Sequence, residues 1–208
     1  MTDTTPATTT RPLPAAASHH PVIRGIADPA ALGLGAFGMS TALLSFGNAG
    51  IVPTAATAVL GLGLFYGGIA QLIAGIWEFV QANTFGALAF VSYGAFWLAY
   101  WWTITDPEIL KEAGGAGMGT FLMLWAVFTT FMIVPCIRIS NLLTALFTAA
   151  AVTFILLAIA EYTSSEILTR IAGYTGLIVG VLGFYGCFAS VVNATWRRSI
   201  IPLGSRDA

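Results

Sequence analysis

The chain has 208 residues and a mass of 21.8 kDa, which is the size of one domain. Hydrophobic residues make up 57% of it and charged residues only 8%, and its mean hydropathy is +0.85. Soluble globular domains carry about 25% charged residues, so this chain could not cover its own surface in water, which excludes a soluble enzyme. The net charge of −1 also excludes nucleic acid as a partner, because nucleic-acid-binding proteins need a basic surface. An integral membrane protein is the class that remains.

The charged residues leave long uncharged stretches along the chain. These stretches are residues 29–77, 79–105, 113–137, 139–160 and 171–196. A transmembrane helix needs about 20 apolar residues, so each of the last four stretches holds one span and the first has room for two. Turn-forming residues at 47–53 divide the first stretch. The chain is therefore predicted to be an all-α integral membrane protein with six transmembrane helices, at 31–47, 55–80, 85–102, 117–137, 142–162 and 171–194. A β-barrel is excluded because the apolar residues are continuous rather than alternating.

The two ends of the chain differ from the apolar middle. Residues 1–27 are rich in Thr, Pro and Ala and contain no apolar core, so we expect a disordered cytoplasmic tail there. Residues 28–196 form the transmembrane domain, and residues 197–208 form a short cytoplasmic tail. The His19-His20 pair is interpreted as part of the first tail rather than as a metal site, because no further ligand accompanies it. No cofactor or metal is expected.

The basic residues predict the orientation of the chain. With six spans, both termini lie on one side of the membrane. Lys and Arg total 8, and six of them fall on that side: Arg11, Arg24, Arg138, Arg197, Arg198 and Arg206. The opposite side receives only Lys111 and Arg170. Because short cytoplasmic segments carry an excess of Lys and Arg, both termini are predicted to be cytoplasmic.

Glycine is frequent, with 23 residues, and many glycines follow helical spacing. Two predicted spans carry such stripes, one at Gly61, Gly63, Gly67, Gly68 and Gly75, and the other at Gly173, Gly176, Gly180 and Gly183. Small residues let helix backbones approach closely in a membrane, where no hydrophobic drive exists between helices. We expect most of these glycines to pack helices within one chain, while a stripe between protomers or beside a pore is the alternative.

Few polar residues lie within the predicted spans, and such residues normally face protein or water. Glu78 is the one ionisable residue deep enough to count as intramembrane, and Gln71 lies two helical turns before it on the same face. A titrating or gating carboxyl beside a polar path is one interpretation. The other is a carboxylate at the membrane interface, paired with a backbone group or with Arg138.

Local capping accounts for several other polar residues. Asp28 and Pro29 are favoured residues at a helix start, and either Asn83 or Thr84 can cap the third helix. Ser92 and Tyr93 fall in the middle of that helix, where a hydroxyl either bonds the preceding turn or faces a pore. No Ser-His-Asp set, phosphate loop or haem-binding His pair is present in the sequence, so no enzymatic chemistry is supported.

Three stretches resemble a known family. The longest is FYGGIAQLIAGIWEF at 65–79, followed by NTFG at 83–86 and SYGAFW at 92–97. The segment DPAALGL at 28–34 resembles the Asn-Pro-Ala-Pro-Leu-Gly-Leu motif of the same family. On these motifs the chain is identified as a member of the acetate uptake transporter (AceTr) family, and the resemblance extends from residue 28 to about residue 204.

The resemblance implies a fold and a function. A six-helix protomer, a homohexamer with one pore per protomer, and a plasma-membrane location are expected from it. The substrates would be acetate and related short carboxylates such as lactate or succinate, carried with protons or through a channel. The family's narrow constriction corresponds to Phe37, Tyr93 and Ala150. The polar motif residues that match are Gln71, Glu78, Asn83, Thr84 and Ser92, and the entrance motif corresponds to Asp28, Pro29, Leu32 and Gly33.

The chain departs from the family pattern at informative positions. Asp28 replaces Asn in the entrance motif and adds a negative charge where an anion would enter, and Ala31 replaces the second Pro. Ala150 and Gly183 are small, which predicts a wider throat and passage of carboxylates larger than acetate.

Two other functions compete with carboxylate transport. A channel for small neutral solutes such as urea or amides is the alternative, and the lack of intramembrane Lys or Arg favours it on physical grounds alone. That lack equally suits a carboxylate that crosses as the protonated acid, and the family motifs favour the carboxylate. A membrane scaffold or sensor is the third class, and the short loops argue against it.

Overall fold

The computed structural model describes residues 26–206, and every long regular element in that range is a helix. All six predicted spans are confirmed as helices long and apolar enough to cross a membrane. The elements are α1 (Ala30–Asn48), α2 (Ala55–Leu62), η1 (Gly63–Ala70), α3 (Gln71–Val80), α4 (Thr84–Thr105), α5 (Pro107–Ile139), α6 (Asn141–Thr163) and α7 (Glu166–Trp196). The expected N-terminal tail, with Arg11, His19, His20 and Arg24, lies outside the described residues apart from its last two positions.

The second span is one continuous rod made of α2, η1 and α3. Its middle part, η1, is a π-helix of 8 residues rather than a single π turn. π-Helices are rare and occur mostly as single-turn bulges inside α-helices. This feature was not predicted, because hydropathy spacing does not distinguish a π-helix from an α-helix over two turns.

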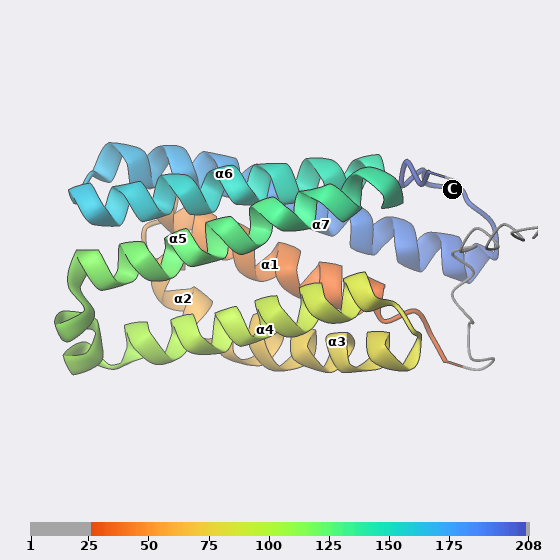
Figure 1. The fold of residues 1–208 in the computed structure, drawn as a ribbon, viewed down its shortest axis with the longest axis horizontal. Helices are drawn as coiled ribbons and strands as arrows, with labels where there is room; N and C mark the ends of the chain where they lie inside the picture. The colour runs from red at the N-terminus through yellow and green to blue at the C-terminus, as the bar shows by residue number, and fades with distance from the viewer. Residues whose placement is uncertain (1–25, 207–208) are drawn as a thin grey trace, which may run out of the picture.

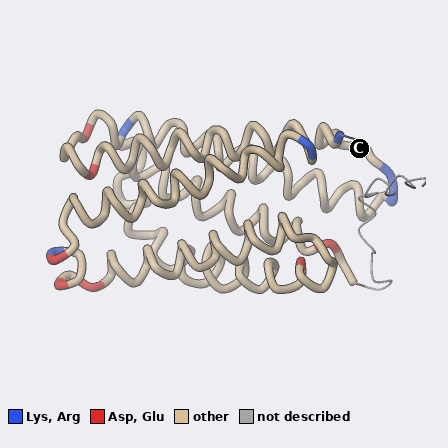
Figure 2. The backbone as a smooth tube through the Cα atoms, in the orientation of Figure 1, with Lys and Arg blue, Asp and Glu red and all other residues tan. Residues whose placement is uncertain are grey.

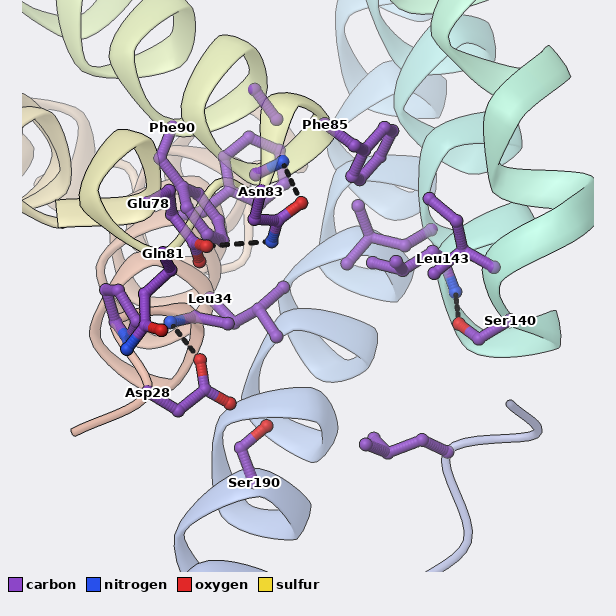
Figure 3. A pocket seen from close by; sticks show the side chains of 18 of the residues that line it. Asp28, Leu34, Glu78, Gln81, Asn83, Phe85, Phe90, Ser140, Leu143 and Ser190 are labelled. Atoms are coloured by element: carbon purple, nitrogen blue, oxygen red, sulfur yellow. Dashed lines mark hydrogen bonds between the residues drawn. The ribbon is translucent and has the colours of Figure 1, made fainter. Parts of the chain in front are cut away.

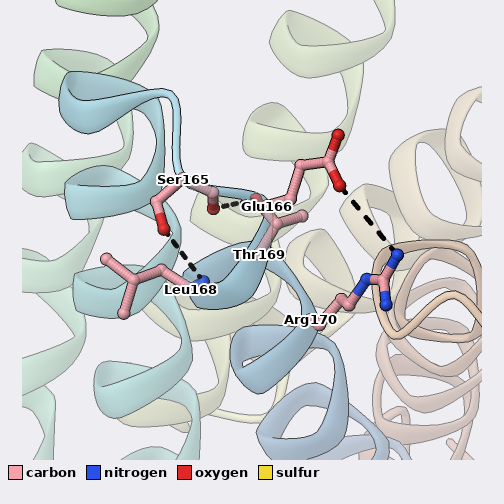
Figure 4. Close-up of polar contacts among 5 residues, drawn as sticks. All are labelled: Ser165, Glu166, Leu168, Thr169 and Arg170. Atoms are coloured by element: carbon pink, nitrogen blue, oxygen red, sulfur yellow. Dashed lines mark hydrogen bonds and ion pairs between the residues drawn. The ribbon is translucent and has the colours of Figure 1, made fainter.

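The helices α5 and α7 begin earlier than the predicted spans. Asp106 accepts hydrogen bonds from the backbone N–H groups of Glu108 and Ile109 and so starts α5, and Gly114, at φ 55° and ψ −174°, separates this first part from the membrane span. Ser165 accepts a hydrogen bond from the Leu168 N–H and starts α7 (Figure 4). The uncharged stretches therefore marked where lipid begins, while caps outside the lipid decide where the helices begin.

The helices run roughly along one axis, with the start of α1, the end of α7, the α3–α4 loop and the α5–α6 corner at one end of the bundle (Figure 1). The charged residues lie toward the two ends of the bundle and leave its middle uncharged (Figure 2). At the far end, Glu166 and Arg170 form an exposed ion pair of 3.9 Å (Figure 4), and such surface pairs contribute little stability. The uncharged middle matches the hydrocarbon layer of a membrane.

The glycine stripe of α7 packs against α1 within the same chain. A Cβ at Gly180 would lie 2.7 Å from the Cβ of Ala42, and one at Gly183 would lie 2.7 Å from the Cα of Gly38. The glycines therefore let the two backbones touch, as expected for packing inside one protomer. The prediction that Gly183 widens a throat is wrong, because its missing side chain is replaced by the backbone of α1. Gly61 differs, since a Cβ there would meet nothing within 4 Å.

This contact can be tested by adding one methyl group. Gly183→Ala is expected to lower the free energy of unfolding by about 1–3 kcal/mol, because the α1 backbone cannot move aside. Gly61→Ala is the matched control and should be neutral or slightly stabilising, since its face is open and alanine favours a helix. Thermal unfolding of the detergent-purified proteins measures both. Equal melting temperatures for the two variants would contradict the packing interpretation.

Candidate functional site

A cavity of about 650 Å³ opens at the end of the bundle that holds both termini (Figure 3). Its walls come from α1, α3, α4 and α6 and from the segments before α1, between α3 and α4, and after α7, with one residue each from α5 and α7. Its mouth carries most of the polar lining residues: Asp28, Glu78, Gln81, Asn83, Ser140, Ser190 and Ser205. Its inner part is lined by Leu34, Phe37, Gln71, Phe90, Tyr93, Leu146 and Phe147. The cavity thus changes from a polar mouth to an apolar inner end.

Glu78 and Asn83 form the central polar contact of the mouth (Figure 3). The Asn83 side-chain N–H donates to Glu78 Oε2 at 2.7 Å, and Asn83 Oδ1 accepts the Gly86 N–H at 3.1 Å, which caps α4. Glu78 is only 1% exposed, and its other oxygen, Oε1, has no partner within the described part of the chain. The proposed pairing with Arg138 is wrong, because the carboxyl bonds to an amide instead. Residue 86 is glycine because a Cβ there would lie 2.7 Å from the Glu78 carboxyl carbon.

The inner end of the cavity is closed by aromatic rings. The ring centroids of Phe37 and Tyr93 are 5.1 Å apart, and the Tyr93 ring lies 5.9 Å from that of Phe147. The Tyr93 hydroxyl and the Thr129 hydroxyl are 2.9 Å apart and share a hydrogen bond, which positions the ring. The structure therefore brings Phe37 and Tyr93 together as predicted, while their role as a pore throat stays a prediction. Gln71 lines the same region.

Other predicted site residues lie away from the cavity wall. Ala150 is buried one turn beyond Phe147 on α6, and Ser92 is half-buried outside the lining. In the entrance motif, Leu32 is 40% exposed and Gly33 packs against the Phe90 ring.

The rest of the entrance motif and Thr84 lie at the mouth. Asp28, Pro29 and Thr84 all line it, and Asp28 accepts the Ala30 N–H at 2.9 Å ahead of α1. The Asp-Pro pair therefore lies at the start of α1 as predicted, but one position early: Pro29 is the N-cap residue, and Ala30 rather than Pro29 is the first helical residue.

The C-terminal segment completes one wall of the mouth, and sequence reasoning missed it. Asn193 Oδ1 accepts the Ile200 and Ile201 N–H groups, which turns the chain back along α7, and Tyr185 donates its hydroxyl to Pro202 O at 2.6 Å. Leu203 and Ser205 then line the cavity. The sequence predicts only a short cytoplasmic tail from residue 197, without contacts to the bundle being considered.

The same segment holds the corner between α5 and α6. Gly204 O accepts the Asn141 N–H at 2.9 Å, and the Arg206 guanidinium donates to Ile137 O and to Asn141 Oδ1. These bonds satisfy backbone groups that both helix ends leave free. The corner that carries Ser140 into the mouth is therefore set by residues more than sixty positions away in the sequence.

The charge of the cavity is one-sided. Within residues 26–206, no Lys or Arg lines it, whereas the carboxyl groups of Asp28 and Glu78 do. An anion in the cavity would find only neutral hydrogen-bond donors and would be repelled by any ionised carboxylate. The geometry favours a neutral solute or a carboxylate that carries a proton.

A family model, curated relatives and a solved structure all match most of this chain. A model of the GPR1/FUN34/yaaH family matches residues 12–203. The succinate-acetate/proton symporter SatP of Escherichia coli K12 is 39% identical over 181 residues, covering 86% of this chain and 96% of that protein. Ammonia transport outward protein 2 of Saccharomyces cerevisiae is 40% identical over 189 residues, covering 86% of this chain and 66% of that protein. A solved structure of the bacterial acetate channel SatP superposes with a TM-score of 0.82 at 38% identity and covers 86% of this chain and 99% of that one.

The contact between Asn83 and Glu78 predicts a stability effect. Asn83→Ala removes the cap of α4 and leaves a buried carboxyl without its donor, which should cost about 1–3 kcal/mol of unfolding free energy. Glu78→Gln is the matched control, because its amide oxygen can still accept the bond from Asn83, so its loss should be smaller. Thermal unfolding in detergent compares the two. A Glu78→Gln protein that melts below Asn83→Ala would show that the carboxylate charge, not the hydrogen bond, is what matters.

Proposed function

The chain belongs to the GPR1/FUN34/yaaH family, and we propose on that premise that it transports acetate and related short carboxylates across a membrane. The observation that carries the proposal is the cavity, which leads from a polar mouth to the ring pair of Phe37 and Tyr93. Such an apolar constriction gates by excluding water, so its opening controls conduction steeply. The pathway would run past Glu78, Asn83 and Thr84 to Gln71 and then between the rings. Ala150, one turn beyond Phe147 on α6, and Ser92, which precedes Tyr93 on α4, would lie next to the constriction.

We further propose that the solute passes as the protonated acid or together with a proton. The cavity offers hydrogen-bond donors and acceptors but no cationic side chain, so a bare carboxylate would lose its hydration without compensation. Glu78 is a candidate proton carrier, because it lines the cavity and one of its carboxyl oxygens has no partner within the described part of the chain. This arrangement is in keeping with the name of the E. coli relative, a proton symporter.

A channel for urea or small amides is the second candidate. It is favoured by one observation, namely that the lining residues include the neutral amides of Gln71, Gln81 and Asn83 and no cation. A neutral amide solute would pair with such groups without needing a proton. The transport assay below separates the two candidates.

For the orientation we propose that both termini face the cytoplasm and that the membrane is the plasma membrane. The basic residues at the end with both termini, Arg138, Arg197, Arg198 and Arg206, support the orientation through the positive-inside rule. The homohexamer expected from the family resemblance also stays a proposal.

Uptake into liposomes tests the substrate. The purified protein should carry labelled acetate faster than protein-free liposomes do, and the excess should rise as the pH falls, because more acid is protonated. Labelled urea should enter no faster than without protein. Urea uptake without acetate uptake would establish the second candidate instead.

The ring pair gives a specific variant for the same assay. Tyr93→Ala is expected to raise acetate flux or admit lactate and succinate, because it removes one ring of the constriction. Tyr93→Phe is the control, since it keeps the ring and loses only the bond to Thr129. If Tyr93→Ala lowers the melting temperature and leaves the flux per folded protein unchanged, Tyr93 is a packing residue and not a gate.

Thiol labelling tests the orientation. In a variant without Cys136 and Cys187, a cysteine replacing Lys111 should react with a membrane-impermeant reagent added outside intact cells. A cysteine replacing the exposed Arg198 should react only after the membrane is opened. The reverse labelling pattern would place both termini outside.

A further inference from the structure

The C-terminal segment, residues 199–206, is anchored to two separate parts of the bundle. At its start, the Asn193 side chain on α7 accepts the Ile201 N–H and donates to Ile201 O, both at 2.9 Å. At its end, the Arg206 guanidinium donates to Ile137 O at 2.7 Å, near the end of α5. The segment therefore ties the end of α7 to the corner between α5 and α6.

The last residues of the segment pair with this corner as a short antiparallel bridge. Ser205 lies opposite Ser140, and the Arg206 N–H donates to Ile139 O at 3.0 Å beside the pair. Ser140 is also the N-cap of α6, where its hydroxyl oxygen accepts the Leu143 N–H at 3.1 Å. The C-terminal segment therefore holds the residue from which α6 starts.

The first turns of α6 have little other backbone support. Within residues 26–206, α6 packs along α5 and α7 and has little backbone contact with α1, α3 or α4, which form the opposite walls of the cavity. Leu143, Leu146 and Phe147 of these turns line the cavity instead. Across the cavity, the Phe147 ring lies 5.9 Å from the Tyr93 ring. Because Phe147 follows Ser140 by two helical turns, the place of its ring depends on what holds the corner.

The bonds that hold the segment lie where water can replace them. The bonds from Arg206 to Ile137 O and from Tyr185 to Pro202 O are exposed, and they lie at the charged end of the bundle (Figure 2). Exposed hydrogen bonds open at a small cost in free energy, because water satisfies both partners. The segment can therefore separate from the corner without leaving polar groups unpaired in hydrocarbon.

We propose that the C-terminal segment is a brace that holds the constriction closed and that releases the α5–α6 corner when the constriction opens. On release, the first turns of α6 move outward and carry Phe147 away from Tyr93. The proposal rests on the proposed transport function and concerns the regulation of the same cavity. It makes Asn193 and Arg206 positioning residues, since neither lines the cavity and both act through the corner.

Thiol labelling measures the release without any transport step. In a protein that lacks Cys136 and Cys187, a cysteine replacing Leu146, which lines the cavity and is 2% exposed, reports access to the inner cavity. Arg206→Ala removes the guanidinium bonds to the corner. It should raise the labelling rate and the acetate uptake per folded protein about three- to tenfold, the equivalent of one lost hydrogen bond.

Arg198→Ala is the matched control. It removes the same charge at the same end of the bundle, but Arg198 precedes the C-terminal segment and lies over the Trp196 ring, 5.9 Å from its centroid. Its labelling rate and uptake should equal those of the parent protein.

A reversible cross-link tests the brace in the opposite direction. The bridge bonds flank Ser140 and Ser205 instead of joining them, and the Cα atoms of such a pair are about 4.5 Å apart, within reach of a disulfide. In the background without native cysteines, Ser140→Cys combined with Ser205→Cys should lose most of its acetate uptake on oxidation. Reduction of the same protein should restore the uptake.

Two results would overturn the brace. One is an equal labelling rate per folded protein in Arg206→Ala and Arg198→Ala, even if Arg206→Ala melts at a lower temperature, because the segment would then be a fixed wall. The other is an oxidised double-cysteine protein that takes up acetate as fast as its reduced form. Faster labelling of Arg206→Ala in a protein that carries no acetate would support the brace and overturn the transport function.

Discussion

Hydrocarbon cannot hydrogen-bond, and this constraint governs nearly every polar contact of the protein. Within the spans, threonine hydroxyls bond back to the preceding turn, as Thr129 does to Trp125 O at 2.7 Å and Thr148 to Thr144 O at 2.7 Å. At the end of the bundle where the cavity opens, the C-terminal segment supplies hydrogen-bond partners to backbone groups at the end of α5 and the start of α6. Two residues with unpaired buried polar atoms, Gln71 and Glu78, line the cavity.

The cavity exists because close packing is uneven around the bundle. Glycines draw α7 onto α1 on one side, and Gly75 and Gly94 draw the second span onto α4 on the other. The large aromatic side chains of α1, α4 and α6 then meet across the remaining space and close its inner end. Lipid-facing positions are mostly apolar and carry no such constraint, which is why the exposed Phe65 or Val134 needs no partner.

The lack of cationic side chains in the cavity lining bears on the form in which a carboxylate would pass. A fixed cation in the spans would attract a carboxylate strongly, but it would also be costly in lipid and would hold the anion in place. Neutral amides and hydroxyls bind more weakly and suit an acid that carries its own proton. The two carboxyl groups at the mouth, Asp28 and Glu78, are consistent with this arrangement, because they disfavour a bare anion there.

The sequence by itself determined the number of spans, the side on which the basic residues gather, the cap at Asn83 and the family, since each depends on contact with lipid or on local spacing. The family resemblance of the sequence also indicated Phe37 and Tyr93 as residues of a constriction. Only the tertiary structure decided that Gly183 touches α1 and not the cavity, that Asn83 rather than Arg138 holds Glu78, and that the C-terminal segment forms a wall of the mouth. Hydropathy reports whether a residue prefers water or an apolar environment. The contacts above depend instead on how closely helices that are distant in the sequence approach one another, and that distance is set by the packing of the whole bundle.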